Sequence, residues 1–501
     1  MNKDFSLSVS AGGSMLKNKY NKDEVRADSL TFPGIYSISN AAGPLETNPY
    51  KSRYAINSFY GMTSLEYKKF LYLDLTARQD WNSVLANPDR SANSGFFYPS
   101  ASVSFIVSEL FKLPSYISFA KFRASSSMVG SGGVTPYLTA YNFPSAGSYY
   151  NGALESPSLL VNPDLKPLKT ISHEIGGDVR FFNNRLGLDF ALYSGNTKDQ
   201  ILQRVVDRSS GYARTLINAG KVKNQGMEFS LNTKPLVSKN GLNWNATVTF
   251  SANENTVVEL ADSSVVLQTG PAGGGQIVVT KGGSMGDLYG RGYVRAPDGQ
   301  VVYDANTGYA LISSDVVYLG NTIPKWKMGF SNQFRYKQFR LNVLFDAQYG
   351  AVAHSMSYAV LSRSGKTKNT LPGRYNGIIG NGVLQNPDGT YRKNNVIAVN
   401  IDEYYRSHYG TDNAEGSTYS TDFIKFREAR LDYTLPVKFA NKIGLQRATI
   451  GVYGRNLFIW TKWPVFDPEF GTLNGTDIIR GFEIAQFPST RTLGINLVVG
   501  I

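Results

Sequence analysis

The stretch Arg340–Tyr349, with the sequence RLNVLFDAQY, alternates apolar and polar residues along most of its length. Successive side chains of a β-strand point to opposite faces of the sheet. A period of two therefore predicts a strand with one apolar side and one polar side. Leu186–Tyr193 (LGLDFALY) and Leu242–Phe250 (LNWNATVTF) have the same pattern. These segments indicate an all-β fold.

The links between the expected strands are alternately short and long. Tyr67–Phe70, Phe182–Arg185 and Tyr336–Phe339 fit tight hairpins, whereas seven long polar stretches lie near 17–53, 82–97, 129–169, 198–221, 254–325, 350–421 and 459–488. We expect about 14 strands, beginning near residues 5, 54, 70, 98, 116, 170, 185, 222, 242, 326, 339, 422, 447 and 489. Short turns on one side and long loops on the other are typical of a transmembrane, antiparallel, up-and-down outer-membrane β-barrel. A β-sandwich has no reason to place every long loop on one side.

The composition agrees with a barrel. Aromatic residues make up 13% of the 501 residues, and such residues suit strands and membrane interfaces. No run of 18 or more apolar residues is present, so we expect no transmembrane helix. The mean hydropathy of −0.23 fits strands that are apolar on one face only. The chain has no cysteine, which excludes disulfides, thiolate metal sites and cysteine nucleophiles.

The formal net charge is +13. This charge fits a solvated basic surface, contact with anionic lipid headgroups, or attraction of anionic solutes. Lysine and arginine are spread along the chain and no nucleic-acid module is visible, so no nucleic-acid partner is expected. His173, His354 and His408 lack metal-ligand spacing. We find no catalytic motif and predict no enzyme, no metal and no cofactor.

The segment Tyr453–Glu469 reads YGRNLFIWTKWPVFDPE. It closely resembles the C-terminal signature of SusC/RagA-type TonB-linked outer-membrane proteins. Asn224–Glu228 (NQGME), Phe423–Glu428 (FIKFRE) and Pro488–Arg491 (PSTR) fit the same family in order, so the resemblance spans about 220–501. The chain departs from many outer-membrane barrels at its end, where Ile501 replaces the usual aromatic residue.

The resemblance implies that residues 1–501 are the C-terminal portion of a TonB-dependent receptor barrel. Barrels of this family have 22 strands and a plugged lumen. The plug, the TonB box and the first strands are not visible here, and the N-terminal MNKDFSLSVSAGG has no signal-peptide pattern. Open sheet edges are not tolerated in lipid, so we expect an N-terminal barrel and plug segment on the same or another chain.

The resemblance also implies a function in the bacterial outer membrane. Family members import large nutrients, such as glycans or oligopeptides, with energy supplied through TonB and with a SusD-like surface lipoprotein as partner. The alternatives are a structural subunit of a larger outer-membrane assembly, for secretion or barrel insertion, and a freestanding porin-like channel. The last alternative requires the first and last strands to pair.

Two groups of residues are candidates for a site, although the sequence assigns no substrate-binding residue. The signature residues are expected to have a structural or partner-docking role, with ligand binding as the alternative; they are Gly454, Arg455, Asn456, Leu457, Trp460, Asp467, Pro468 and Glu469. Loop tyrosines could stack on sugars or peptides, or they could stiffen loops and meet a partner protein. These are Tyr137, Tyr141, Tyr149, Tyr150, Tyr404, Tyr405 and Tyr409.

Overall fold

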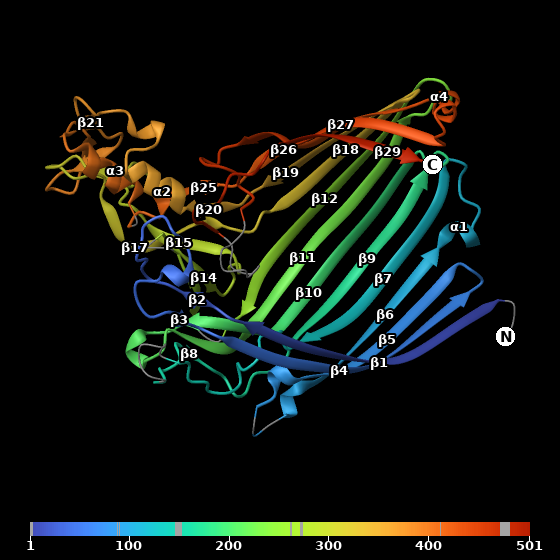
Figure 1. Cartoon of the computed structure of the whole chain (residues 1–501), viewed down its shortest axis with the longest axis horizontal. Coiled ribbons are helices and arrows are strands. Elements are labelled where there is room, and N and C mark those ends of the chain that lie inside the picture. Colours follow the sequence, from blue (N-terminus) through green and yellow to red (C-terminus); the bar gives the residue numbers. More distant parts are fainter. Residues whose placement is uncertain are drawn as a thin grey trace.

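One large antiparallel sheet dominates the computed structural model, which describes residues 4–87, 89, 91–145, 153–260, 263–270, 274–410, 412–470 and 481–501 (Figure 1). Its main path follows the chain and contains β1 (Phe5–Lys22), β4 (Tyr50–Tyr67), β5 (Leu71–Asn82), β6 (Gly95–Ile106), β7 (Ile117–Ser131), β9 (Leu168–Phe181), β10 (Leu186–Val205), β11 (Arg214–Leu236), β12 (Leu242–Glu259), β18 (Trp326–Tyr336), β19 (Phe339–Tyr349), β26 (Phe423–Thr434), β27 (Arg447–Thr461) and β29 (Thr492–Gly500). The short β8 (Leu159–Leu160) pairs in parallel with β11. The predicted all-β class is confirmed, and the strands lie near the predicted positions. The loop expected at 198–221 is shorter than predicted, because β10 extends to Val205 and β11 begins at Arg214.

The two ends of the sheet differ as expected. At one end lie the tight turns, together with the short helices α1 (Val107–Leu110) and α4 (Val437–Lys442) and both chain termini (Figure 1). Lys68 and Lys69 in the first hairpin have φ values of 47° and 61°, the left-handed pair that a type I′ turn requires. All the long loops leave the opposite end, which confirms the predicted alternation of short and long links.

The outward face of the sheet is apolar and is bordered by aromatic rings. Trp326 stacks between Phe250 and Tyr349 near the loop end, with ring centroids 6.1 and 5.6 Å apart. Trp244 stacks on Phe334 near the turn end, at 5.6 Å. Eight residues separate Trp326 from Phe334, or roughly 27 Å along a strand. A tilt of about 40° reduces this to a height of roughly 21 Å, close to the apolar band of membrane barrels.

The sheet has two end strands. Among the described residues, β1 pairs only with β4 and β29 pairs only with β27, so the sheet forms a curved wall with two open edges. The freestanding porin-like channel requires these two strands to pair with each other, and that pairing is not found in this part of the chain. None of the described helices is both long and apolar enough to cross a membrane.

The loops between β12 and β18, between β19 and β26, and between β27 and β29 fold together, and we call them the loop assembly. It has two helices, α2 (Met356–Arg363) and α3 (Ile401–Tyr409), and short strands: β13 (Ser264–Thr269), β14 (Gln276–Thr280), β15 (Asp287–Tyr293), β16 (Val302–Tyr303), β17 (Ile312–Asn321), β20 (Val352–Ser355), β21 (Ile378–Ile379), β22 (Val383–Gln385), β23 (Tyr391–Lys393), β24 (Ile397–Ala398), β25 (Thr418–Ser420) and β28 (Phe482–Glu483). The first long loop carries β2 (Val25–Arg26) and β3 (Glu46–Thr47). Val279 and Leu288 are buried in an apolar cluster that the assembly shares with β10, β11 and β12, and Leu384 is buried in a second cluster within the loops. The expected polar loops are therefore a folded unit, with helices confined to loops and turns.

Candidate functional site

The signature segment begins with a β-bulge that aims one arginine into the lumen. Phe426 pairs with Phe458 and Glu428 pairs with Arg455, so two residues of β27 lie opposite Arg427 of β26. A bulge of this kind requires a residue in the left-handed region, and Asn456 supplies it with φ 51°. Asparagine tolerates this conformation better than most residues.

The arginine at the bulge belongs to a network of five charged side chains on the inner face of the wall. Arg427 donates two hydrogen bonds to Asp346 of β19, at 2.7 and 2.8 Å, and also pairs with Glu469. Lys425, whose side chain is 5% exposed, bonds Asp467 at 2.5 Å and also Glu469. The backbone N–H of Glu469 donates to Asp467 at 2.9 Å. The last loop is thereby fastened to the inside of the sheet.

The structure places the signature residues on both sides of the wall. Asp467 and Glu469 lie on the inner side and bind basic side chains of this same chain. Pro468 lines an inner cavity next to Phe470. Gly454 and Leu457 line an apolar groove on the outer face, and Trp460 is 55% exposed there. Arg455 bonds Glu428 of the next strand, and Asn456 donates to the carbonyl of Thr490.

A concave region of about 630 Å³ on the inner face connects this network to the middle of the wall. Arg123 of β7 donates two bonds to Asp189, both at 3.1 Å, and lies 3.5 Å from Glu174. A Cβ on Gly176 would lie 2.9 Å from the Arg123 guanidinium, so the glycine makes room for the arginine. The inner wall is thus charged, internally paired and suited to contact with water or a hydrated solute.

A buried carboxylate joins the loops outside the sheet. Glu483 on β28 is 1% exposed, and its carboxylate accepts hydrogen bonds from the hydroxyls of Ser355 and Ser357 at 2.6 and 2.5 Å. It also accepts from the N–H of Gln486 at 3.1 Å. Because β28 pairs with β20, residues 128 positions apart in the chain are held side by side. This contact makes the loop assembly a single unit.

His354 lies next to this carboxylate and is 1% exposed. Neither ring nitrogen has a hydrogen-bond partner of good geometry, and the ring packs 6.3 Å from Phe482. Burial lowers the pKa of His354 to about 4; a weak interaction with the Ala414 backbone and the charge of Glu483 oppose this shift without cancelling it. The folded loop assembly therefore holds a neutral histidine at neutral pH.

A pH dependence follows from the lowered pKa. Below about pH 6.5 the unfolded assembly binds a proton at His354, whereas the folded assembly does not until about pH 4. The contribution to stability is therefore complete above about pH 6.5 and falls by roughly 3 kcal/mol as the pH decreases to about 4. We expect protease resistance of the loop assembly to fall over this range, and His354→Leu to weaken that dependence. An equally steep loss in the variant would contradict this account.

The loop tyrosines do not act as one group. Tyr404 and Tyr405 are each 6% exposed and pack in an apolar cluster, so the expectation that they could stack on a solute is wrong and a role in stiffening the loops is supported. The reason is that α3 turns this side toward Tyr303, Ala310 and Leu384. Tyr137 and Tyr141 are exposed, Tyr409 packs partly buried against the same cluster, and Tyr149 and Tyr150 lie outside the described residues.

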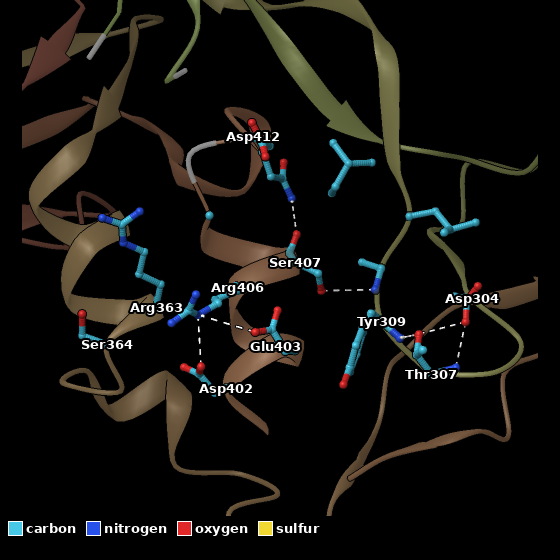
Figure 2. Close-up of a pocket in the computed structure, with 15 residues that line it drawn as sticks. Asp304, Thr307, Tyr309, Arg363, Ser364, Asp402, Glu403, Arg406, Ser407 and Asp412 are labelled. Atoms are coloured by element: carbon cyan, nitrogen blue, oxygen red, sulfur yellow. Dashed lines mark hydrogen bonds and ion pairs between the residues drawn. The ribbon is translucent and has the colours of Figure 1, made fainter. Parts of the chain in front are cut away.

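A polar pocket of about 980 Å³ lies on the outer part of the loop assembly (Figure 2). Helix α3 carries Asp402, Glu403 and Arg406 along one wall; the end of α2 contributes Arg363, and the segment before β17 contributes Tyr309. Within the described residues, no group of three or more histidine, aspartate or glutamate side chains could hold a metal ion. Asp388 and Gly389 form a tight turn elsewhere in the loop assembly, with Gly389 at φ 84°.

Comparison with known proteins agrees with this geometry. The family model described as TonB dependent receptor-like, beta-barrel matches residues 2–349, more than half of the chain. The chain belongs to this receptor barrel family. The resemblance to the SusC/RagA type, which rested on residues near the C-terminus, is therefore supported independently by residues outside the signature. The chain is an outer-membrane β-barrel protein that crosses the membrane with its strands.

Individual relatives of the receptor chain show how much of it is similar to known proteins. TonB-dependent receptor P3 of Formosa agariphila is 25% identical over 92% of this chain and 47% of its own length. TonB-dependent receptor SusC of Bacteroides thetaiotaomicron is 25% identical over 45% of this chain and 23% of its own length. A solved structure of the RagAB peptide transporter matches the fold with a TM-score of 0.74, at 19% identity, over 99% of this chain and 53% of that chain. The chain spans about half the length of the relatives it matches.

Proposed function

We propose that this chain is the C-terminal barrel portion of a TonB-dependent importer of large nutrients, either glycans or oligopeptides. The observation that carries the proposal is a curved wall of the receptor family with an apolar outer face and a charged, internally paired inner face. The likeness of its fold to the RagAB peptide transporter supports the same direction. The wall carries no reaction in this proposal; it positions the solute path and anchors the loops.

The partners in this proposal follow from the two open edges and the folded loops. An N-terminal segment with the plug and first strands closes the barrel and contacts TonB, on the same or another chain. A SusD-like lipoprotein covers the loop assembly. The signature residues have a structural role here, because Asp467 and Glu469 are engaged by Lys425 and Arg427. In this proposal the outer loops provide the surface to which the lipoprotein docks.

A scaffold role in a larger outer-membrane assembly is the second candidate. The observation in its favour is the extent of the folded loop assembly, which offers a partner a rigid outer surface. The two roles differ in their dependence on energy. An importer needs TonB and the proton gradient for its function, whereas a scaffold does not.

The test is a deletion of this coding sequence in its native cells, followed by growth on defined glycans and oligopeptides as sole nutrients. The importer proposal expects loss of growth on one nutrient class, recovery by the intact gene, and no recovery in cells that lack TonB. The intact mass of the native protein, measured in parallel, shows whether plug and barrel share one chain. Normal growth on every nutrient combined with loss of another outer-membrane complex would favour the scaffold.

A further inference from the structure

The outer pocket contains one cation without a partner. The carboxylates that line the pocket are engaged: Asp402 lies 3.1 Å and Glu403 4.0 Å from Arg406. Asp304 accepts hydrogen bonds from its own turn, and Asp412 lies 3.8 Å from Arg291. Arg363, half-buried at the end of α2, has no ion pair or hydrogen bond among the described residues. A guanidinium in this position is free to bind an anion.

The chain segment that follows this arginine is basic, whereas the carboxylates of the pocket come from α3 and from the segments around Asp304 and Asp412. The segment between Asp346 and Asp388 contains no aspartate or glutamate. Arg374 donates to the carbonyls of Gly365 and Thr370, which bracket Lys366 and Lys368, so these three cations lie close to the end of α2. None of them forms an ion pair in the described structure. Unpaired cations that cluster at a pocket rim raise the local concentration of anionic solutes.

The inner part of the pocket suits hydroxyl groups. Asp402 keeps a carboxylate oxygen as an acceptor beside the N–H groups of Arg406, and Ser364 contributes a hydroxyl. The ring of Tyr309 lies between α3 and the turn that carries Asp304 and Thr307 (Figure 2). A sugar presents hydroxyls that both donate and accept, and its apolar ring face packs on an aromatic side chain. Ala310, Leu311 and Ile312 are the aliphatic residues of the wall.

We propose that this pocket is a binding subsite for an acidic saccharide, whose hydroxyls lie against Tyr309 and α3 and whose carboxylate or sulfate binds Arg363 at the rim. The proposal rests on the proposed import function and narrows its substrate class. The planar guanidinium group can donate two parallel hydrogen bonds to a carboxylate or a sulfate. Arg363 therefore favours the charged sugar over its neutral counterpart. Lys366 and Arg374 then guide the solute by charge.

The experiment is calorimetric titration of the receptor with its N-terminal barrel and plug segment, purified from outer membranes in detergent micelles. The ligands are trigalacturonate, a sulfated trisaccharide, neutral galactotriose and triglutamate. We expect one of the two acidic saccharides to bind best, and its affinity to fall as salt increases. Arg363→Ala should weaken that binding by about 10-fold or more, because a charge-assisted bond is lost. Arg363→Lys should recover part of the affinity, and Tyr309→Ala should weaken the sugar but not triglutamate.

The matched control is Lys281→Ala, which removes an exposed cation from the same loop assembly outside the pocket. Any of three results would overturn the proposal. These are an equal affinity for acidic and neutral saccharides, a tighter binding of triglutamate than of any saccharide, and unchanged affinity in the Arg363→Ala protein. Thermal unfolding of each variant shows that the loop assembly is intact. Growth on nutrients separates the two claims. If the pocket does not bind an acidic saccharide but nutrient uptake is normal, the import function stands. If the pocket binds but nutrient uptake does not depend on this protein, only the import function is overturned.

Discussion

Replacing Lys425 with alanine is expected to cause the largest loss of stability of any single change on the inner wall. Lys425 is the cation that Asp467 and Glu469 share, and its side chain is 5% exposed. Removing Lys425 leaves the two carboxylates partly buried, with their negative charge only partly neutralised by the remaining basic side chain. Breaking a buried ion pair from one side costs about 3–5 kcal/mol. The last loop should come away from the wall, and thermal unfolding and protease cleavage near residues 462–470 should report this.

Two further variants test this explanation. Lys327→Ala removes an exposed lysine from the same inner face and should leave unfolding and cleavage unchanged. Adding Asp467→Asn to Lys425→Met should recover part of the stability, because Glu469 still has Arg427 as its partner. If Lys425→Ala unfolded at the same temperature as the unchanged protein, the network would not anchor the loop.

Replacing Glu483 with alanine is expected to separate the last loop from the rest of the loop assembly. The change removes the acceptor for two serine hydroxyls and two backbone N–H groups, of Ser357 and Gln486, in a buried site. Hydrogen bonds to a buried charge contribute about 1.5–3 kcal/mol each, and they are not additive. We expect a local loss of about 3 kcal/mol, seen as faster amide exchange in 352–355 and 481–487.

The amides of the membrane strands provide the internal reference for this measurement. Their exchange should not change, because the sheet is held by its own ladder of hydrogen bonds. Glu254→Ala is the matched control, since this exposed carboxylate has Gln225 as its hydrogen-bond partner. Slow exchange in 481–487 of the Glu483→Ala protein would mean that other contacts hold β28 against β20.

The sheet could be predicted from the sequence because its two faces meet different environments. Lipid on one side and a hydrated lumen on the other impose the alternation seen in β19, and turn residues mark each hairpin. The loop assembly could not be predicted in the same way. Its short strands pair across distant loops, as β20 does with β28, and no local period records such a pairing. Its buried residues are scattered among polar ones.

The candidate site was predicted in part. The signature segment identified Asp467 and Glu469, and the segment FIKFRE already contained their partners Lys425 and Arg427. The pairing was not predictable, because it depends on the bulge at Asn456 and on the return of the loop into the lumen. The sequence left two roles open for the tyrosines of α3, because a run of aromatic residues in a polar loop does not reveal which side of a short helix is buried. The sequence did not identify Arg363 as a candidate binding residue, because whether its side chain has a partner depends on which neighbouring charges are already paired.

We expect this chain to cross the outer membrane with its loop assembly outside and its tight turns inside. Because the chain has no cysteine, single cysteines can be introduced without background from this chain. Tyr375→Cys lies on the loop assembly, where Tyr375 is 99% exposed, and Asn183→Cys lies in a tight turn. With a membrane-impermeant maleimide, we expect intact cells to label position 375 and to label position 183 only after the outer membrane is opened. Labelling of position 183 in intact cells, with position 375 protected, would contradict the account.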